Sequence, residues 1–147
     1  MEADMNHLNN VLLEGILVDD PKLIPLAEQP ESVSLVKFDV ASDRFYVDRN
    51  GKKACETVFV PIQCWGSLGE KCLERLRKGM TCRTVGRLRL CKWIASDGSS
   101  RRAIEIVANH IEFRRPKNGS SPAGTEILEE KDNESDSAGE IEVLYEV

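Results

Sequence analysis

Arginine and tryptophan alternate in one short stretch of this sequence, "VGRLRLCKW" at residues 85–93. Successive side chains of a strand point to opposite faces, so a strand here would place Arg87, Arg89 and Trp93 on the same face. Guanidinium groups attract phosphates, and an aromatic ring stacks on an unpaired base for about 1 to 3 kcal/mol. The pattern therefore indicates a surface that binds single-stranded nucleic acid.

A second stretch, "TVFVPIQCW" at residues 57–65, also alternates. One of its faces is apolar and suits a core, comprising Val58, Val60, Ile62 and Cys64. Phe59 and Trp65 must then point outward. A one-residue shift in register would bury aromatic residues instead, but it would bury the two arginines as well, at several kcal/mol per unpaired ion. We therefore expect the aromatic and cationic residues to point outward and Leu88 and Leu90 to face the core.

Further cations lie on expected loop tips and strand ends near this face. Each of them can contact a phosphate or be ordinary solvated charge: Arg44, Lys52, Lys53, Arg101 and Arg102. The "DRNG" segment that begins at Asp48 has the Asn-Gly pair typical of a hairpin tip.

The order of the expected elements predicts an all-β fold. Alternation and turn residues predict five strands, within residues 9–21, 32–47, 57–65, 81–93 and 101–113. Leu68, Cys72, Leu73 and Leu76 recur at helical spacing, which predicts one helix within residues 66–79, between the third and fourth strands. Five strands with a helix at that place form the oligonucleotide-binding (OB) fold, a five-stranded Greek-key barrel.

Composition divides the chain into a mildly basic body and an acidic tail. Nine acids and one lysine give residues 118–147 a net charge of −8, while 16 acids and 19 bases give residues 1–117 a net charge of +3. We expect an OB-fold domain at residues 1–115 and a disordered linker and acidic tail at residues 116–147. We find no membrane span and no signal peptide, and expect a cytoplasmic protein.

Metal, disulfide and catalytic chemistry find little support in the residue pattern. The five cysteines include no C-x-x-C pair, and neither of the two histidines lies near a cysteine at ligand spacing. There is no Ser/His/Asp pattern and no glycine-rich phosphate loop followed by Lys and Ser/Thr. We expect no metal, no cofactor and no catalytic residue.

Several segments, in order, resemble the bacterial single-stranded DNA-binding proteins: "NNVLLEGILVDDP", "FDVASDRF", "FVPIQCWGSLGEKCLERLRKG", "VGRLRLCKW", "DGSSRR" and "EIVANHIEF". The resemblance spans about residues 9–113. It implies an OB-fold core that assembles as a homotetramer and binds single-stranded DNA without sequence preference in replication, recombination and repair, associated with the nucleoid.

The resemblance also implies site residues. The base-stacking positions fall on Tyr46, Phe59, Trp65 and Trp93, and the phosphate-contacting positions on Arg89, Lys92 and Arg101 or Arg102. Tyr46 is an even number of residues from the core-facing Phe38 and Val40. It therefore has the same parity, which means that an unbroken strand would point it to the same face. Either a bulge intervenes or Phe45 takes its role.

The end of the chain departs from the family pattern, which closes on an Ile-Pro-Phe tip. This chain closes "EIEVLYEV", in which apolar residues alternate with acids. Such a segment can dock on a basic pocket of a replication or repair protein. The candidate partner-binding residues are Glu140, Glu142, Leu144, Tyr145, Glu146 and Val147.

Three other functions remain open. The protein could be an RNA-binding module or a replication-restart accessory protein, because RNA and DNA bases offer the same stacking faces. It could be an interaction scaffold whose aromatic face packs against another protein. It could be an enzyme, although the outward acids are scattered.

Overall fold

The computed structural model describes residues 4–25, 33–114 and 125–129. Its elements are, in chain order, β1 (Val11–Leu17), β2 (Lys22–Ile24), β3 (Leu35–Val47), β4 (Lys53–Trp65), α1 (Gly66–Arg75), β5 (Thr81–Ile94), β6 (Ser100–Arg114) and β7 (Thr125–Glu129).

Five of the strands close into a barrel. β1 pairs with β5, β5 with β6, β6 with β4, β4 with β3, and β3 returns to β1. All of these pairings are antiparallel except β4 with β6. With α1 between the third and fourth barrel strands, this arrangement confirms the predicted OB fold. β2 pairs with β3, and β7 pairs with β6, outside the ring.

Helix α1 packs against the barrel core. Leu68 and Cys72 on the helix and Leu76 just after it are fully buried, among core residues such as Ile62 and Phe113. The predicted helical spacing is thus confirmed, although α1 ends at Arg75, before the expected stop at Gly79. One end of the barrel is therefore filled by aliphatic and thiol side chains rather than left open.

Two glycines let the strands approach closely. A Cβ on Gly86 would lie 2.1 Å from the Val107 carbonyl oxygen, and a Cβ on Gly15 would lie 2.6 Å from the Ala41 carbonyl oxygen. Gly15 lies where β1 passes from β5 to β3, since its neighbour Ile16 pairs with both strands. These close contacts allow β1 and β5 to coil tightly enough to close the barrel.

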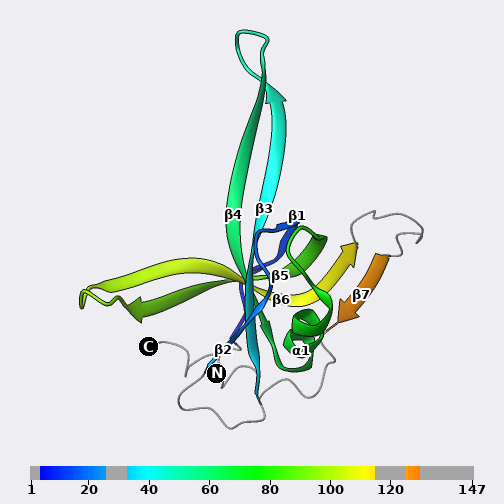
Figure 1. The fold of residues 1–147 in the computed structure, drawn as a ribbon. Helices are drawn as coiled ribbons and strands as arrows, with labels where there is room; N and C mark the ends of the chain where they lie inside the picture. The colour runs from blue at the N-terminus through cyan, green and yellow to red at the C-terminus, as the bar shows by residue number, and fades with distance from the viewer. Residues whose placement is uncertain (1–3, 26–32, 115–124, 130–147) are drawn as a thin grey trace.

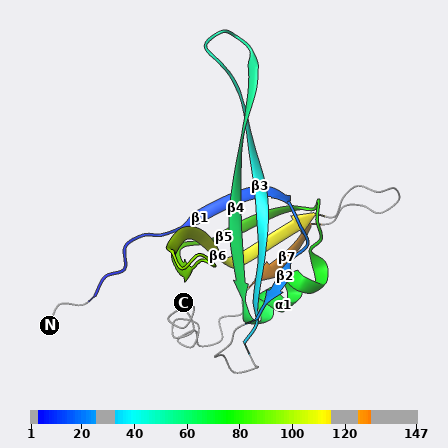
Figure 2. The ribbon, with the colours of Figure 1, turned by 60° about the vertical axis from the view of Figure 1, so that its left-hand side comes forward.

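Two long hairpins extend beyond the barrel (Figure 1). β4 meets β6 only at Ile62 with Ile106 and at Gln63 with Val107. Beyond these pairs the strands separate into a β3–β4 arm and a β5–β6 arm that point in different directions, and Figure 2 shows the twist of the β3–β4 arm. Gly51 and Gly98 at the two tips have φ values of 78° and 84°, which suit glycine in tight turns.

The arms overturn part of the predicted core. Val58, Leu88 and Leu90 were expected to face the core, but each is more than two-fifths exposed. All three lie on the arm portions of β4 and β5, where a two-stranded ribbon leaves both of its faces in solvent. Parity assigned the side of the strand correctly, but it could not show where the barrel ends.

The prediction of disorder from residue 116 is wrong for β7. Thr125–Glu129 pair antiparallel with His110–Arg114 of β6, and Leu128 is 4% exposed within the barrel core. An apolar residue in an acidic segment can thus extend the sheet when a strand edge and a core position are available. The candidate tail residues lie outside the described residues: Glu140, Glu142, Leu144, Tyr145, Glu146 and Val147.

Leu128→Ala tests whether β7 belongs to the folded domain. Removing a buried leucine should lower the free energy of unfolding by about 2 to 5 kcal/mol, because the lost contacts leave a cavity. The measurement is urea unfolding of the full chain. The matched control is Leu8→Ala, whose side chain is exposed and should change stability little. Equal stability of the two variants would contradict the packing of β7.

Candidate nucleic-acid interface

The candidate site occupies the outward side of β3, β4, β5 and β6 along the two arms and at their base, here called the arm face. Strand register places its members in cross-strand pairs, such as Phe59 with Ala41 and Trp93 with Arg101. Phe59 is 66% exposed and Trp93 is 40% exposed. Two aromatic rings thus face solvent, one on each arm, as predicted.

Trp65 also lies on the arm face, but the prediction that it is exposed is wrong. Its side chain is 7% exposed, and it packs in a small cluster with Leu35 and Val107. Ile24 of β2 and Val33 pack against the same cluster. The sequence did not predict β2, so nothing in the strand pattern indicated that this tryptophan would be covered.

A buried polar cluster lies beside Trp65 and was not predicted. It consists of Lys37 on β3, Gln63 on β4, Cys91 on β5 and Glu105 on β6. The Gln63 side-chain amide donates to Glu105 Oε1 and to Cys91 Sγ, each at 3.0 Å, and its oxygen accepts from Trp65 Nε1 at 3.2 Å. Lys37 Nζ lies 2.7 Å from Glu105 Oε1. The cluster therefore ties four strands together where the arms diverge.

The cluster also keeps the Cys91 thiol protonated. Burial, followed by the negative charge of Glu105, raises the pKa of Cys91, while the Gln63 hydrogen bond and the cations Arg89 and Lys37 oppose the rise. A thiol with a raised pKa is a poor nucleophile at neutral pH. Cys91 thus acts as a small acceptor within the cluster.

One sequence signal could have found this cluster. Lys37 and Glu105 are opposite charges at positions of arm-face parity, and Glu105 is flanked by Ile104 and Ile106. A charged residue between two β-branched residues in a central strand is expected to be buried. Because an unpaired buried charge is costly, it needs a partner of opposite charge on the same face.

The β5–β6 arm separates its cations onto two faces. Arg87, Arg89, Trp93 and Arg101 share the arm face by register, whereas Lys92 pairs with Arg102 on the opposite face. Near the tip, Arg101 lies 3.6 Å from Asp97. The Ser99 hydroxyl and backbone N–H hold the pKa of Asp97 below its usual value, so Asp97 stays ionised. The structure therefore groups some of the predicted cations and separates Lys92 and Arg102 from them.

The β3–β4 arm resolves the parity of the predicted Tyr46. β3 and β4 pair without a bulge from Leu35 to Val47, so Tyr46 keeps the parity of Phe38 and Val40. Phe45 pairs with Cys55 and shares the parity of Phe59, and it is exposed. By register, Phe45 extends the arm face rather than Tyr46.

The remaining cations of the β3–β4 arm lie toward its tip. The Arg44 guanidinium lies 5.0 Å from the centroid of the Tyr46 ring and 3.7 Å from the Glu56 carboxylate, on the face opposite Phe45. Lys53 pairs with Val47 and shares the parity of Phe59, and Lys52 lies in the tip; both are exposed. The tip thus carries positive charge that solvent and ligands can reach.

Comparison with known proteins identifies the family. The model of the "Single-strand binding protein family" matches residues 8–114. This chain belongs to the single-strand binding protein family. The Single-stranded DNA-binding protein of Caldanaerobacter subterraneus subsp. tengcongensis is 33% identical over 129 residues, which cover 88% of this chain and 82% of the relative. Single-stranded DNA-binding protein 2 of Chlorobaculum tepidum is 34% identical over 119 residues, 78% of each chain.

A solved structure of the same fold supports the architecture of this family member. The Plasmodium falciparum SSB complex with ssDNA aligns with a TM-score of 0.62 and 19% identity, over 86% of this chain and all of that chain. At this identity the likeness supports the OB fold alone.

The described ranges contain neither a metal-binding group nor a membrane-spanning helix. No group of three or more His, Cys, Asp or Glu residues could hold a metal ion there. None of the helices described is long and apolar enough to cross a membrane.

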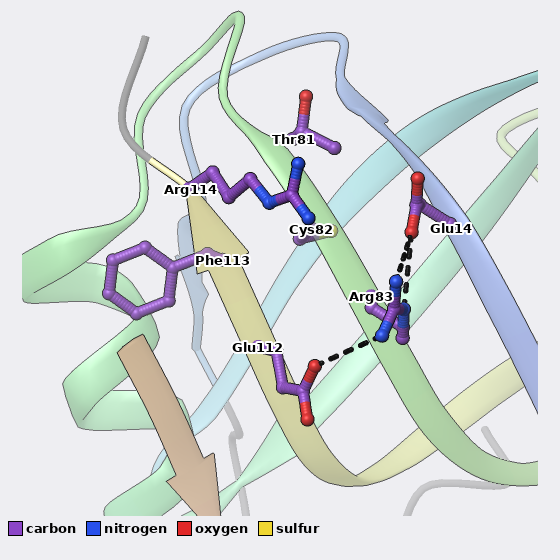
Figure 3. Close-up of a pocket in the computed structure, with 7 residues that line it drawn as sticks. All are labelled: Glu14, Thr81, Cys82, Arg83, Glu112, Phe113 and Arg114. Carbon is purple, nitrogen blue, oxygen red and sulfur yellow. Dashed lines mark hydrogen bonds and ion pairs between the residues drawn. The ribbon is translucent and has the colours of Figure 1, made fainter. Parts of the chain in front are cut away.

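The outer surface of the barrel at β1, the start of β5 and the end of β6, here called the back face, carries an ion-pair row (Figure 3). Arg83 lies between Glu14, at 2.9 Å, and Glu112, at 3.4 Å. These side chains line a small hollow together with Thr81, Cys82, Phe113 and Arg114. The back face thus presents paired charges.

The two tryptophans of the chain can be distinguished by fluorescence quenching. A Trp93→Phe variant retains only the buried Trp65, so acrylamide should quench its emission weakly. A Trp65→Phe variant retains only the half-exposed Trp93, so quenching should be stronger and the emission red-shifted. Equal quenching constants for the two variants would contradict the burial of Trp65.

Proposed function

We propose that this protein binds single-stranded DNA without sequence preference. Bases stack on Phe59 and Trp93, and cations of the arms contact the phosphates. One observation carries the proposal: two exposed aromatic rings lie on the two arms, on the same face as Arg87, Arg89 and Arg101. Membership of the family and the names of its relatives support it. Such binding protects and organises single strands on the nucleoid during replication, recombination and repair.

The lack of sequence preference follows from the kinds of contact available. Every base has an aromatic face that can stack, and phosphates are the same at every position. The single described helix, α1, packs its apolar side on the barrel core and so offers no recognition helix for base edges. Binding should therefore depend strongly on salt and weakly on sequence.

The proposed function needs neither catalysis nor a cofactor. The relatives are named DNA-binding proteins. Stacking and phosphate contacts are equilibrium interactions, so the free energy of binding alone can keep the bound DNA single-stranded.

The proposal includes self-association into a homotetramer. β1 pairs with β3 only through Ile16 and Leu17, so within the described residues Val11–Glu14 have no strand partner on the side away from β5. Leu12 in this stretch is exposed. An unpaired edge with an exposed apolar side chain favours pairing with a second copy.

The proposal also includes recruitment of replication and repair proteins by the chain end. Acids alternate with apolar residues from Glu140 to Val147, and such a segment suits a basic pocket with an apolar floor. Because β7 ends at Glu129 and belongs to the sheet, a truncation that tests recruitment must begin after Glu129.

Phe59→Ala and Trp93→Ala test the stacking contacts. Each should weaken binding of oligodeoxythymidine by about 1 to 3 kcal/mol, because one stacked base is lost, without reducing stability. The measurement is fluorescence anisotropy of a labelled strand.

The matched control is Ile94→Ala. Ile94 is exposed beside Trp93, but register places it on the other face of the arm. Its substitution should leave the affinity unchanged. Equal affinity of wild type, Phe59→Ala and Trp93→Ala would exclude these rings from the DNA path.

Leu12→Lys tests the self-association surface. A charge on the exposed strand edge should lower the mass measured by light scattering from four chains toward one, because edge pairing would bury the lysine. Leu23→Lys, at an exposed position on β2, is the control and should not lower it. A wild-type protein with the mass of one chain would contradict the proposal.

A further inference from the structure

A buried carboxylate lies on the face that is proposed to bind a polyanion. Glu105 is 5% exposed and belongs to the polar cluster at the base of the two arms. Its negative charge would repel phosphates unless a cation compensates for it. The proposed DNA-binding role does not explain why a carboxylate occupies this place.

Lys37 supplies the compensating charge. Its Nζ lies 2.7 Å from Glu105 Oε1, and its side chain is 24% exposed against 6% for Glu105. Lys37 belongs to β3 and Glu105 to β6, so the ion pair reaches across β4. The ammonium is thus near the surface of the arm face but is directed to a buried carboxylate.

The ion pair has apolar groups, a neutral amide and two arginines as neighbours: Arg89 pairs in register with Glu105, and Arg87 pairs with Val107. Gln63 donates to Glu105 at 3.0 Å, and the nearby Trp65 and Val107 are apolar where they pack. Exposed cations lie farther out, with Arg101 near one tip and Lys53 near the other. Cations therefore line the arm face from its base to both tips, and at the base the Lys37 ammonium is held by a buried carboxylate.

We propose that Glu105 is a positioning residue that withholds Lys37 from the DNA backbone. A strand that crosses the base of the arms then has Arg87 and Arg89 as phosphate contacts there, but not the Lys37 ammonium. This inference rests on the proposed single-stranded DNA binding. It assigns to the Lys37–Glu105 pair a limit on the number of phosphates that the base of the arms contacts.

Glu105→Gln is the test. The amide has the shape of the carboxylate and can still accept from Gln63, but it no longer neutralises Lys37. The freed ammonium should contact one more phosphate. The plot of log affinity for oligodeoxythymidine against log salt should then become steeper by about 0.7, with tighter binding at low salt.

Glu112→Gln is the matched control. It also removes one negative charge from a half-buried ion pair, with Arg83 at 3.4 Å, but on the back face. It should leave the slope at the wild-type value. The double variant Lys37→Met/Glu105→Gln has lost both charges, so it should return the slope to the wild-type value as well.

Lys37→Met alone should leave the slope unchanged, because a withheld lysine contacts no phosphate. Circular dichroism and urea unfolding identify the folded variants. If Glu105→Gln does not fold, the double variant and Lys37→Met still test whether Lys37 is withheld from the DNA. A wild-type slope in folded Glu105→Gln, or a slope reduced by about 0.7 in Lys37→Met, would overturn the inference while wild-type binding stands. Failure of the wild-type protein to bind any single strand would overturn the proposed function itself.

Discussion

The short parallel contact between β4 and β6 determines the rest of this structure. Two residue pairs, Ile62 with Ile106 and Gln63 with Val107, close the barrel. The strands on either side are 13 to 15 residues long, far longer than closure requires. Their remaining length must leave the barrel, and it does so as two hairpin arms. A compact core and an extended binding face thus follow from one contact placed near the end of β4 and in the middle of β6.

The same contact explains why polar residues are buried on the arm face. Where the strands diverge, side chains from four of them meet, and Gln63 can reach Cys91, Glu105 and Trp65 together. A buried ion pair such as Lys37 with Glu105 contributes little net stability, because desolvation offsets most of the attraction. The pair helps to hold four strands at the base of the arms, and its place on the candidate binding face gives it the role in binding proposed above.

The sequence predicted the barrel, the helix and the outward direction of Phe59 and Trp93, because alternation and helical spacing record which side of an element meets the core. It did not predict where the barrel ends, so Leu88 was assigned to the core although it lies on an arm. It did not reveal β2 or β7, because three-residue and five-residue strands carry too little alternation to stand out. Burial of Trp65 depends on β2, and such contacts between distant segments leave no local pattern.

The account holds that a single strand crosses the arm face with its bases toward Phe59 and Trp93. Photocrosslinking measures this most directly. The wild-type protein is irradiated with an oligonucleotide of 5-iododeoxyuridine, and the crosslinked peptides are mapped by mass spectrometry. The account predicts crosslinks at Phe59 and Trp93, with none on the back face beside Glu14 and Arg83. Crosslinks confined to the back face or to α1 would contradict it.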